Sequence, residues 1–298
     1  MAEPAIELQH GRGRVLVCPE IGGAIARFRW GGRDILRPVS DAAIAAGEVR
    51  QMGVFPLAPY SNRVARAQLL ANGQAFALRP NFPGEPHSLH GFGWQRPWRV
   101  AAQTEQRVVL ALEHQPDDDW PFACRLVQRI VLEDRILRLQ LTLTNTDSRP
   151  MPAGLGFHPF FPIDDALHLQ TGWQGMWQMG EDRLPTEHTA VPPRADFSSP
   201  RPVRGWVVDH CFTGWNRSAA LQYARHTVLI EAGESAPNIV CFVPGDGRPF
   251  IALEPVSNIN NAHALAARGV PDTGLQILQP GASFEIAMSL SVEGNPAG

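Results

Sequence analysis

The clearest pattern in this chain is a strict alternation of apolar and polar positions. Leucine occupies every second position from Leu137 to Leu143, and arginine, glutamine or threonine fills the positions between. Because successive side chains of a strand point to opposite faces of a sheet, this pattern predicts a strand with one buried face and one solvated face. The same alternation from Phe284 to Glu293 predicts a last strand of this kind.

Turn-forming residues separate several further apolar segments. The segment CRLVQRIVL runs through Glu133 and Asp134 into the leucine strand, which predicts a hairpin with a tight acidic turn. The pair Gly31-Gly32 predicts a second hairpin turn. The remaining strand candidates are RVLVC, AIARFRW, VVLALEH, LQYARHTVLIE, NIVCFVP and PFIALEP.

Helical segments are few and short, essentially DAAIAAG near residue 44 and NAHALAARG near residue 265. Many short strands, together with 27 glycines and 27 prolines, predict an all-β fold, a large antiparallel β-sandwich. Neither a repeat nor a linker divides the chain. We therefore expect a single domain over residues 1–298, with the proline-rich segment 191–203 as a long surface loop.

Composition and charge limit the possible partners. The 298 residues carry a net charge of -3 with a pI near 6.4, which argues against binding to nucleic acid. No stretch approaches the roughly 20 apolar residues that span a bilayer, and the N-terminus lacks the apolar core of a signal peptide. We therefore expect a cytoplasmic protein without a membrane partner, either a monomer or a homodimer.

The available side-chain chemistry is limited too, because the sequence contains no lysine and all 26 residues counted as Lys+Arg are arginines. This excludes Schiff-base chemistry, attachment of pyridoxal phosphate and the lysine of a phosphate-binding P-loop. The four cysteines are far apart and form no C-x-x-C pair, so we expect buried thiols: Cys18, Cys124, Cys211 and Cys241. We expect no cofactor.

Glu254 is the first candidate catalytic residue. It ends the apolar run PFIALE, and alternation places it on the same face as Phe250 and Ala252. Because Pro255 would stop ladder pairing after it, we expect its carboxylate to project into a cleft as a general base. The structural alternative is an edge glutamate paired with an arginine.

His158 is the second candidate catalytic residue. It lies in GLGFHPFFP, where Phe157, Phe160 and Phe161 supply an apolar wall and Pro159 keeps the preceding backbone extended. Its imidazole can donate a proton near neutral pH. The structural alternative is a core histidine bonded to a backbone carbonyl.

Two further clusters offer ligand-binding groups. Arg63, next to Asn62, has a planar fork of donors that suits vicinal hydroxyls or an anion. His90 is followed by a glycine and precedes Trp94 and Trp98, a combination expected where a polar ligand with an apolar face docks.

Metal binding is an alternative use of several of these side chains. No pair has a recognised ligand spacing, and the glycine- and proline-rich segment around HSLH does not look helical, so we expect no metal. The possible ligands are His87, His90, His158, Asp209, His210 and Glu254.

The order of these motifs resembles that of the aldose 1-epimerase (galactose mutarotase) family. NRV, LHGFGW, GFHPFF, VDHCF and LEP follow one another over most of the chain, and WGGRDILRP and NGQAFALRPN stand in the expected places. The sequence after His158 resembles that of a bacterial aldose 1-epimerase-like subgroup. In this subgroup HPFF or HPYF stands where galactose mutarotases have a serine after the histidine. The resemblance implies a galactose mutarotase-like supersandwich.

The resemblance also implies a role for single residues. Glu254 matches the catalytic base of the family and His158 its catalytic acid, while Arg63, His90 and Asp209 match positions that grip sugar hydroxyls. An acid at the ring oxygen and a base at the anomeric hydroxyl suffice to open and reclose a hemiacetal. The expected function is therefore that of an isomerase that interconverts the α and β anomers of a free aldose.

Three alternative functions stay open at this point. A hexose-6-phosphate 1-epimerase would add a phosphate grip, for which Arg63, Arg66 and Arg96 are candidates. A carbohydrate-binding protein would have the cleft without the chemistry. A glycoside hydrolase or lyase would need a second carboxylate, for which Asp209 is the candidate.

Overall fold

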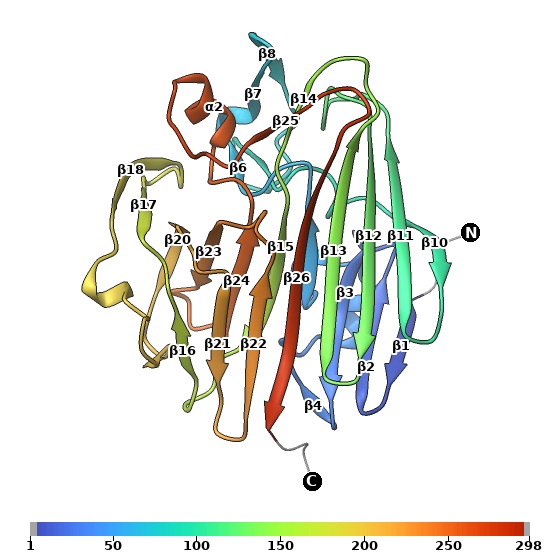
Figure 1. Ribbon diagram of the computed structural model, residues 1–298, viewed down its shortest axis with the longest axis vertical. Helices are drawn as coiled ribbons and strands as arrows, with labels where there is room; N and C mark the ends of the chain where they lie inside the picture. The colour runs from blue at the N-terminus through green and yellow to red at the C-terminus, as the bar shows by residue number, and fades with distance from the viewer. Residues whose placement is uncertain (1–4, 295–298) are drawn as a thin grey trace.

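Two large antiparallel sheets dominate the computed structural model, which describes residues 5–294 (Figure 1). They pack face to face around a large apolar core to which both sheets contribute. The nine-stranded sheet has the order β10 (Arg99–Gln103), β11 (Arg107–His114), β12 (Cys124–Glu133), β13 (Ile136–Asn145), β26 (Ser283–Gly294), β22 (His226–Ala232), β21 (Ser218–Gln222), β16 (His168–Thr171) and β19 (Arg201–Pro202).

The second sheet has eleven strands and carries the polar motifs. Its order is β1 (Ile6–His10), β2 (Gly13–Cys18), β3 (Ala24–Trp30), β5 (Val54–Leu57), β15 (Gly156–Pro162), β24 (Phe250–Val256), β23 (Asn238–Val243), β20 (Val208–Thr213), β17 (Gly175–Met179) and β18 (Pro185–Ala190), with β4 (Arg33–Asp34) paired to β3.

Short elements complete the fold and gather mainly at one end of the sandwich (Figure 1). Three two-stranded ladders pair β6 (Arg63–Val64) with β9 (Ser88–Leu89), β7 (Gln68–Ala71) with β8 (Gln74–Ala77), and β14 (Met151–Ala153) with β25 (Gln276–Leu278). The helices are α1 (Asp41–Ala45) and α2 (Ala262–Ala267), with 3-10 turns η1 (Val49–Gln51), η2 (Ala65–Ala67) and η3 (Pro193–Ala195). Within residues 5–294, no helix has the length and apolarity needed to cross a membrane.

The predicted all-β antiparallel sandwich is confirmed, and so is the alternation in β13 and β26. All four leucines of β13 lie in the core. Both predicted helices are present, and Gly31-Gly32 forms the turn between β3 and β4.

Three predictions about individual segments need correction. Glu133 pairs with Ile136, so the tight turn consists of Asp134 and Arg135. The segment LQYARHTVLIE is two strands, because β21 turns back into β22 after Gln222. The proline-rich segment 191–203 is not loop throughout, since it contains η3 and the short strand β19.

The middle strands of the eleven-stranded sheet are buried on both faces. Every residue of β5 and β24 is buried, as is nearly every residue of β15. One face packs on the core between the sheets, and the other packs on a second apolar cluster that includes Phe55, Phe160 and Ala252. This second face holds the polar residues of the site.

Candidate active site

A cavity of about 820 Å³ opens on this second face of the eleven-stranded sheet. Strands β5, β15, β20, β23 and β24 contribute side chains to its wall, together with the loops that precede β6 and follow β9. All six residues predicted to act on a ligand line it: Asn62, Arg63, His90, His158, Asp209 and Glu254.

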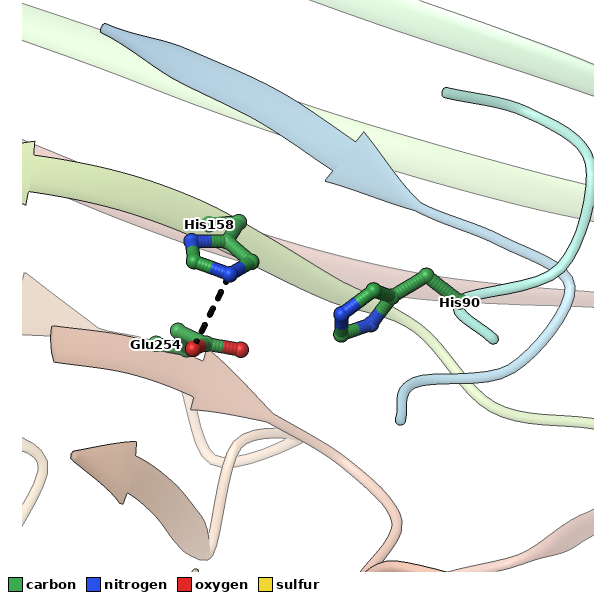
Figure 2. A group of neighbouring side chains, drawn as sticks. All are labelled: His90, His158 and Glu254. Carbon is green, nitrogen blue, oxygen red and sulfur yellow. Dashed lines mark ion pairs between the residues drawn. The ribbon is translucent and has the colours of Figure 1, made fainter. Parts of the chain in front are cut away.

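His158 and Glu254 lie opposite one another on neighbouring strands, β15 and β24. The register that pairs Gly156 with Val256 and Phe160 with Ala252 sets His158 across from Glu254. Their side chains meet at 3.1 Å between His158 Nε2 and Glu254 Oε1 (Figure 2). The sequence spacing did not predict this contact, because almost one hundred residues separate the two strands in the chain.

Pro255 does not end β24 as predicted. The strand continues to Val256, and Pro255 itself lies opposite Ile239 of β23. Proline lacks only the backbone donor, so it interrupts ladder hydrogen bonds without ending the extended conformation. Glu254 therefore lies inside a buried strand rather than at its end, and the predicted shared face with Phe250 and Ala252 is confirmed.

Both members of the His158–Glu254 pair are deeply buried, with 8% and 2% of their surface exposed. Burial raises the pKa of Glu254 well above its usual range, and nearby Asp209 adds to the effect. Burial also lowers the pKa of His158 well below its usual range. Glu254 Oε2 and His158 Nδ1 have no hydrogen-bond partner among the described residues. The pair therefore favours a state with one shared proton and no net charge.

His90 is fixed in one tautomer by Asn62. The backbone N–H of Asn62 donates to His90 Nδ1 at 3.0 Å, and the backbone N–H of His90 donates to the carbonyl of Asn62 at 2.9 Å. Burial lowers the pKa of His90 to about 3, so the ring is neutral. Because Nδ1 accepts a hydrogen bond, Nε2 carries the proton. His90 thus offers one N–H donor to a ligand.

The turn after His90 depends on Gly91. Gly91 has a φ of +67°, and a Cβ built on it would lie 2.2 Å from the carbonyl oxygen of Ala58. Only glycine fits this close approach of two backbone segments. Gly91 therefore helps to hold the His90 loop against the end of β5.

Arg63 lines the cavity, but its fork is already engaged by Glu85. Arg63 Nε and Nη2 donate to the two carboxylate oxygens of Glu85 at 2.7 and 2.8 Å, and Nη1 donates to Asn62 Oδ1 at 3.2 Å. These bonds lower the pKa of Glu85. One N–H on each terminal nitrogen remains for a ligand. Sequence reasoning missed Glu85, which no local pattern distinguishes from a surface glutamate.

Asp209 and His210 point to opposite faces of β20. Asp209 lines the cavity, where burial raises its pKa although Arg63 lowers it. No described residue forms a hydrogen bond or ion pair with its carboxylate, which is therefore a free acceptor. His210 lies on the other face of the strand and is not part of the cavity wall.

His87 connects two backbone segments and does not line the cavity. Its Nδ1 accepts from the backbone N–H of Arg66 at 2.9 Å, and its Nε2 lies 3.1 Å from the carbonyl oxygen of Asp182. It joins the segment before β9 to the turn between β17 and β18. Of the two histidines in HSLH, only His90 faces the cavity.

Three aromatic rings form the apolar wall beside the pair. Phe160 stacks on the His158 ring at 4.3 Å between centroids, and Phe55 packs on it at 4.6 Å. Trp94 stacks in turn on Phe55 at 5.5 Å. Sequence reasoning missed Phe55 because it precedes a proline-rich loop without any polar neighbour.

Three aromatic side chains that were predicted near the site face the core instead, two from the predicted wall at His158 and one from the segment after His90. Phe157 and Phe161 face the core between the sheets, since they alternate with His158 and Phe160 along β15. Trp98 is also a core residue, and its indole N–H donates to the carbonyl of Gly93 at 2.8 Å.

One metal-like cluster exists in the described part of the chain. One ligand atom each of His90, His158 and Glu254 lies within 4.8 Å of the others, an approach that the spacing in the sequence did not predict (Figure 2). The tautomer of His90 does not suit a metal, because Nδ1 accepts from Asn62 and Nε2 carries a proton. The cluster instead presents a donor beside an acid–base pair.

This chain is similar to known proteins over nearly its whole length. The sequence model of the Aldose 1-epimerase family matches residues 4–291. The uncharacterized protein YphB of Escherichia coli (strain K12) is 30% identical over 295 residues, which cover 96% of this chain and 98% of YphB.

Solved structures share its fold. An Escherichia coli K12 crystal structure superposes with a TM-score of 0.88 at 29% identity, covering 98% of this chain and 99% of that one. A galactose mutarotase-like protein from Clostridium acetobutylicum has a TM-score of 0.86 at 17% identity, covering 98% and 95%. The latter shows a shared fold.

Proposed function

Because the chain belongs to the aldose 1-epimerase family, a family of carbohydrate isomerases, we propose that it interconverts the α and β anomers of an aldose. The observation that carries this proposal is the His158–Glu254 pair, a 3.1 Å contact between an acid and a base in the wall of a cavity. Anomer exchange requires only two proton transfers on one sugar.

In the proposed mechanism, Glu254 removes the proton from the C1 hydroxyl while protonated His158 donates a proton to the ring oxygen. The bond between C1 and the ring oxygen breaks, and an open-chain aldehyde forms. Rotation about C1–C2 presents the other face of the carbonyl. Ring closure then reverses both transfers, with Glu254 as the acid and His158 as the base.

The electrostatics of the pair suit this cycle. Ring opening converts a carboxylate and an imidazolium into a carboxylic acid and a neutral imidazole, so the pair has no net charge before or after. Burial raises the pKa of Glu254 and lowers that of His158. These opposite shifts favour transfer of the proton from His158 to Glu254, which is the net change that ring opening makes, in a site that disfavours net charge.

The surrounding residues supply the hydrogen bonds that would orient the sugar. His90 offers an N–H, Asp209 a free carboxylate, and Arg63 its two remaining N–H groups. The amide N–H groups of Asn62 are available as well, since its oxygen already accepts from Arg63. Phe55 and Trp94 provide the apolar surface on which a sugar ring packs.

NMR magnetisation exchange on α- and β-aldoses tests the proposal. We expect the protein to accelerate exchange for at least one member of a panel of hexoses, pentoses and 6-deoxy sugars, and Glu254→Gln to abolish most of the acceleration. Sugar binding without acceleration would instead support a carbohydrate-binding protein. Equal rates for Glu254→Gln and the unchanged protein would show that Glu254 is not the base.

The arginines first considered as a phosphate grip do not form one. Arg66 is not part of the cavity wall, and Arg96 is held elsewhere by His114, Asp117 and Asp119. Arg63 is neutralised by Glu85. This set therefore gives no support to a hexose-6-phosphate 1-epimerase.

A further inference from the structure

A second set of arginines lines the end of the cavity that lies across Phe160 from His158. Arg37, Arg50 and Arg248 belong to the cavity wall there. Arg37 is the most enclosed of the three and is half-buried, whereas Arg50 and Arg248 are exposed. We call Arg37 and Arg248 the arginine pair.

Arg37 is a guanidinium without a carboxylate. Its Nη2 donates to the backbone carbonyls of Arg50 and of Met52, the latter at 3.0 Å. No ion pair joins Arg37 to an acidic side chain of residues 5–294. Its pKa is lowered to about 10, first by burial and then by the charge of Arg248. A half-buried cation that is repelled by a second cation costs free energy, which a bound anion would offset.

The arginine pair shares one aromatic ring. The guanidinium carbon of Arg37 lies 4.9 Å from the centre of the Phe250 ring, and that of Arg248 lies 5.1 Å from it. Arg248 also binds Asp246, through Nε at 3.0 and 2.8 Å, so its terminal nitrogens are not used in that contact. Glu48 is the other acidic residue at this end, and it is exposed and accepts from Gln51.

A stack of rings connects the arginine pair to the acid–base pair. Arg37 lies over the Phe160 ring at 3.7 Å, and Phe160 stacks on His158 at 4.3 Å with 20° between the ring planes. Both guanidiniums therefore line the same cavity as His158, and Arg37 and His158 both stack on the Phe160 ring.

We propose that Arg37 and Arg248 form a subsite for an anionic group, a carboxylate or a phosphate, on the end of the aldose remote from C1. This inference rests on the proposed function, and it specifies the substrates as aldoses that carry a negatively charged group. Two guanidiniums can share the oxygens of one carboxylate or phosphate through charge-assisted hydrogen bonds. Asp246 pairs with Arg248 but not with Arg37, so a sugar that offers only hydroxyl groups would leave Arg37 without a carboxylate or phosphate partner.

The test compares three sugars that differ at C6: glucose, glucuronate and glucose 6-phosphate. Magnetisation exchange gives kcat/KM for each with the full-length protein. We expect at least about tenfold higher kcat/KM for one or both anionic sugars than for glucose, the size expected for one charge-assisted contact. Glucuronate and glucose 6-phosphate distinguish a carboxylate site from a phosphate site.

Variants then assign the preference to the arginine pair. We expect Arg37→Gln and Arg248→Gln each to lower the ratio of kcat/KM for the anionic sugar over glucose by about tenfold. Arg37→Lys should retain more of the ratio than Arg37→Gln. The ratio is the readout because loss of Arg37 can also shift Phe160 and slow every sugar alike. Arg138→Gln, on the solvent face of β13, is the matched control and should leave the ratio unchanged.

The outcomes separate the subsite from the proposed function. If glucose is exchanged as fast as both anionic sugars, or if the ratio survives in both glutamine variants, the subsite is overturned and the proposed function stands. If no sugar is exchanged faster than in buffer, the proposed function fails. Calorimetry with glucose 6-phosphate and glucuronate then decides the subsite: binding that Arg248→Gln weakens supports it, and absence of binding or equal binding overturns it.

Discussion

Two cross-strand pairs, one in each large sheet, show what burial does to similar local geometry. Between β15 and β24, the register sets His158 opposite Glu254, and between β13 and β26 it sets Thr142 opposite Glu285. The contact distances are similar, 3.1 Å from His158 Nε2 to Glu254 and 2.9 Å from the Thr142 hydroxyl to Glu285. Glu254 is 2% exposed, whereas Glu285 faces solvent.

Access to water makes the difference between the two pairs. Glu285 is solvated and also accepts from Gln140 at 2.6 Å, so its contacts only help to join the strands. Glu254 has one oxygen without any partner among residues 5–294, and burial raises its pKa while it lowers that of His158. The exposed pair joins two strands, whereas burial of the His158–Glu254 pair favours a single shared proton, which the proposed mechanism transfers.

Replacing the buried pair tests this comparison most strongly. We expect His158→Asn and Glu254→Gln each to lower kcat for anomer exchange by about 10²- to 10⁴-fold, because each removes one proton transfer. The double variant should lose little more than either single variant, since the two groups act as a unit. NMR magnetisation exchange at constant sugar concentration measures all three rates.

The exposed pair provides the matched control for this cycle. Thr142→Val and Glu285→Gln should leave kcat unchanged and should alter the free energy of unfolding by about 1 kcal/mol or less. Fully additive losses in the buried pair would contradict a shared proton. A loss of kcat in the exposed pair would contradict the division of roles between the sheets.

The second largest effect is expected for Leu141→Ala, on the buried face of the nine-stranded sheet. Leu141 is fully buried next to Thr142, so Leu141→Ala should lower the free energy of unfolding by about 2–5 kcal/mol through lost apolar contacts and a cavity. Urea unfolding followed by tryptophan fluorescence measures this change. The kcat per folded molecule should stay the same, and a fall in kcat beyond the loss of folded protein would count against the comparison.

The same contrast explains how much of the fold could be predicted from the sequence. Strands β13 and β26 have one solvated face, so their alternation was visible in the sequence and was confirmed. Strands β5 and β15 are buried on both faces and therefore lack alternation. This is why the roles of Phe157 and Phe161 were assigned to the wrong face.

The site was predictable only residue by residue. Motif order singled out His158 and Glu254, but their contact depends on a register between distant strands that no local pattern encodes. Glu85 and Phe55 were missed because each acts through a neighbour that the fold, not the sequence, brings close. The single domain, the oligomeric state and the cytoplasmic location stay predictions.

The pH dependence of kcat is the next test of the buried His158–Glu254 pair. The proposed mechanism requires one proton on the His158–Glu254 pair. Burial lowers the pKa of His158, so the pair binds a second proton only at a pH below the usual pKa range of a histidine. Activity should fall on the acid side as that second proton binds. Since burial raises the pKa of Glu254, activity should fall on the alkaline side as that group ionises.

Rates of magnetisation exchange from pH 4 to 9, corrected for the reaction in buffer, test this profile over about five pH units. For the unchanged protein and for Glu285→Gln we expect a plateau, with any acid limb below the usual range of a histidine and any alkaline limb above the usual range of a glutamate. The residual activity of Glu254→Gln should lack the alkaline limb. An alkaline limb that persists in Glu254→Gln would assign it to another group.

The smallest expected effect is on stability, and it has the opposite sign to the effect on activity. The unfolded chain ionises Glu254 as the pH rises through about 4.3, whereas the folded protein holds the proton to higher pH because burial raises the pKa. Between these two pKa values the folded state binds more protons, so ionisation of Glu254 in the unfolded chain lowers stability as the pH rises.

Glu254→Gln removes this loss. Its melting temperature relative to the unchanged protein should therefore increase from pH 4 to pH 7, by a few degrees if the difference reaches about 1 kcal/mol. Glu285→Gln, measured by the same calorimetry, should show no such increase, and a parallel increase in both variants would mean that burial is not what separates the two glutamates.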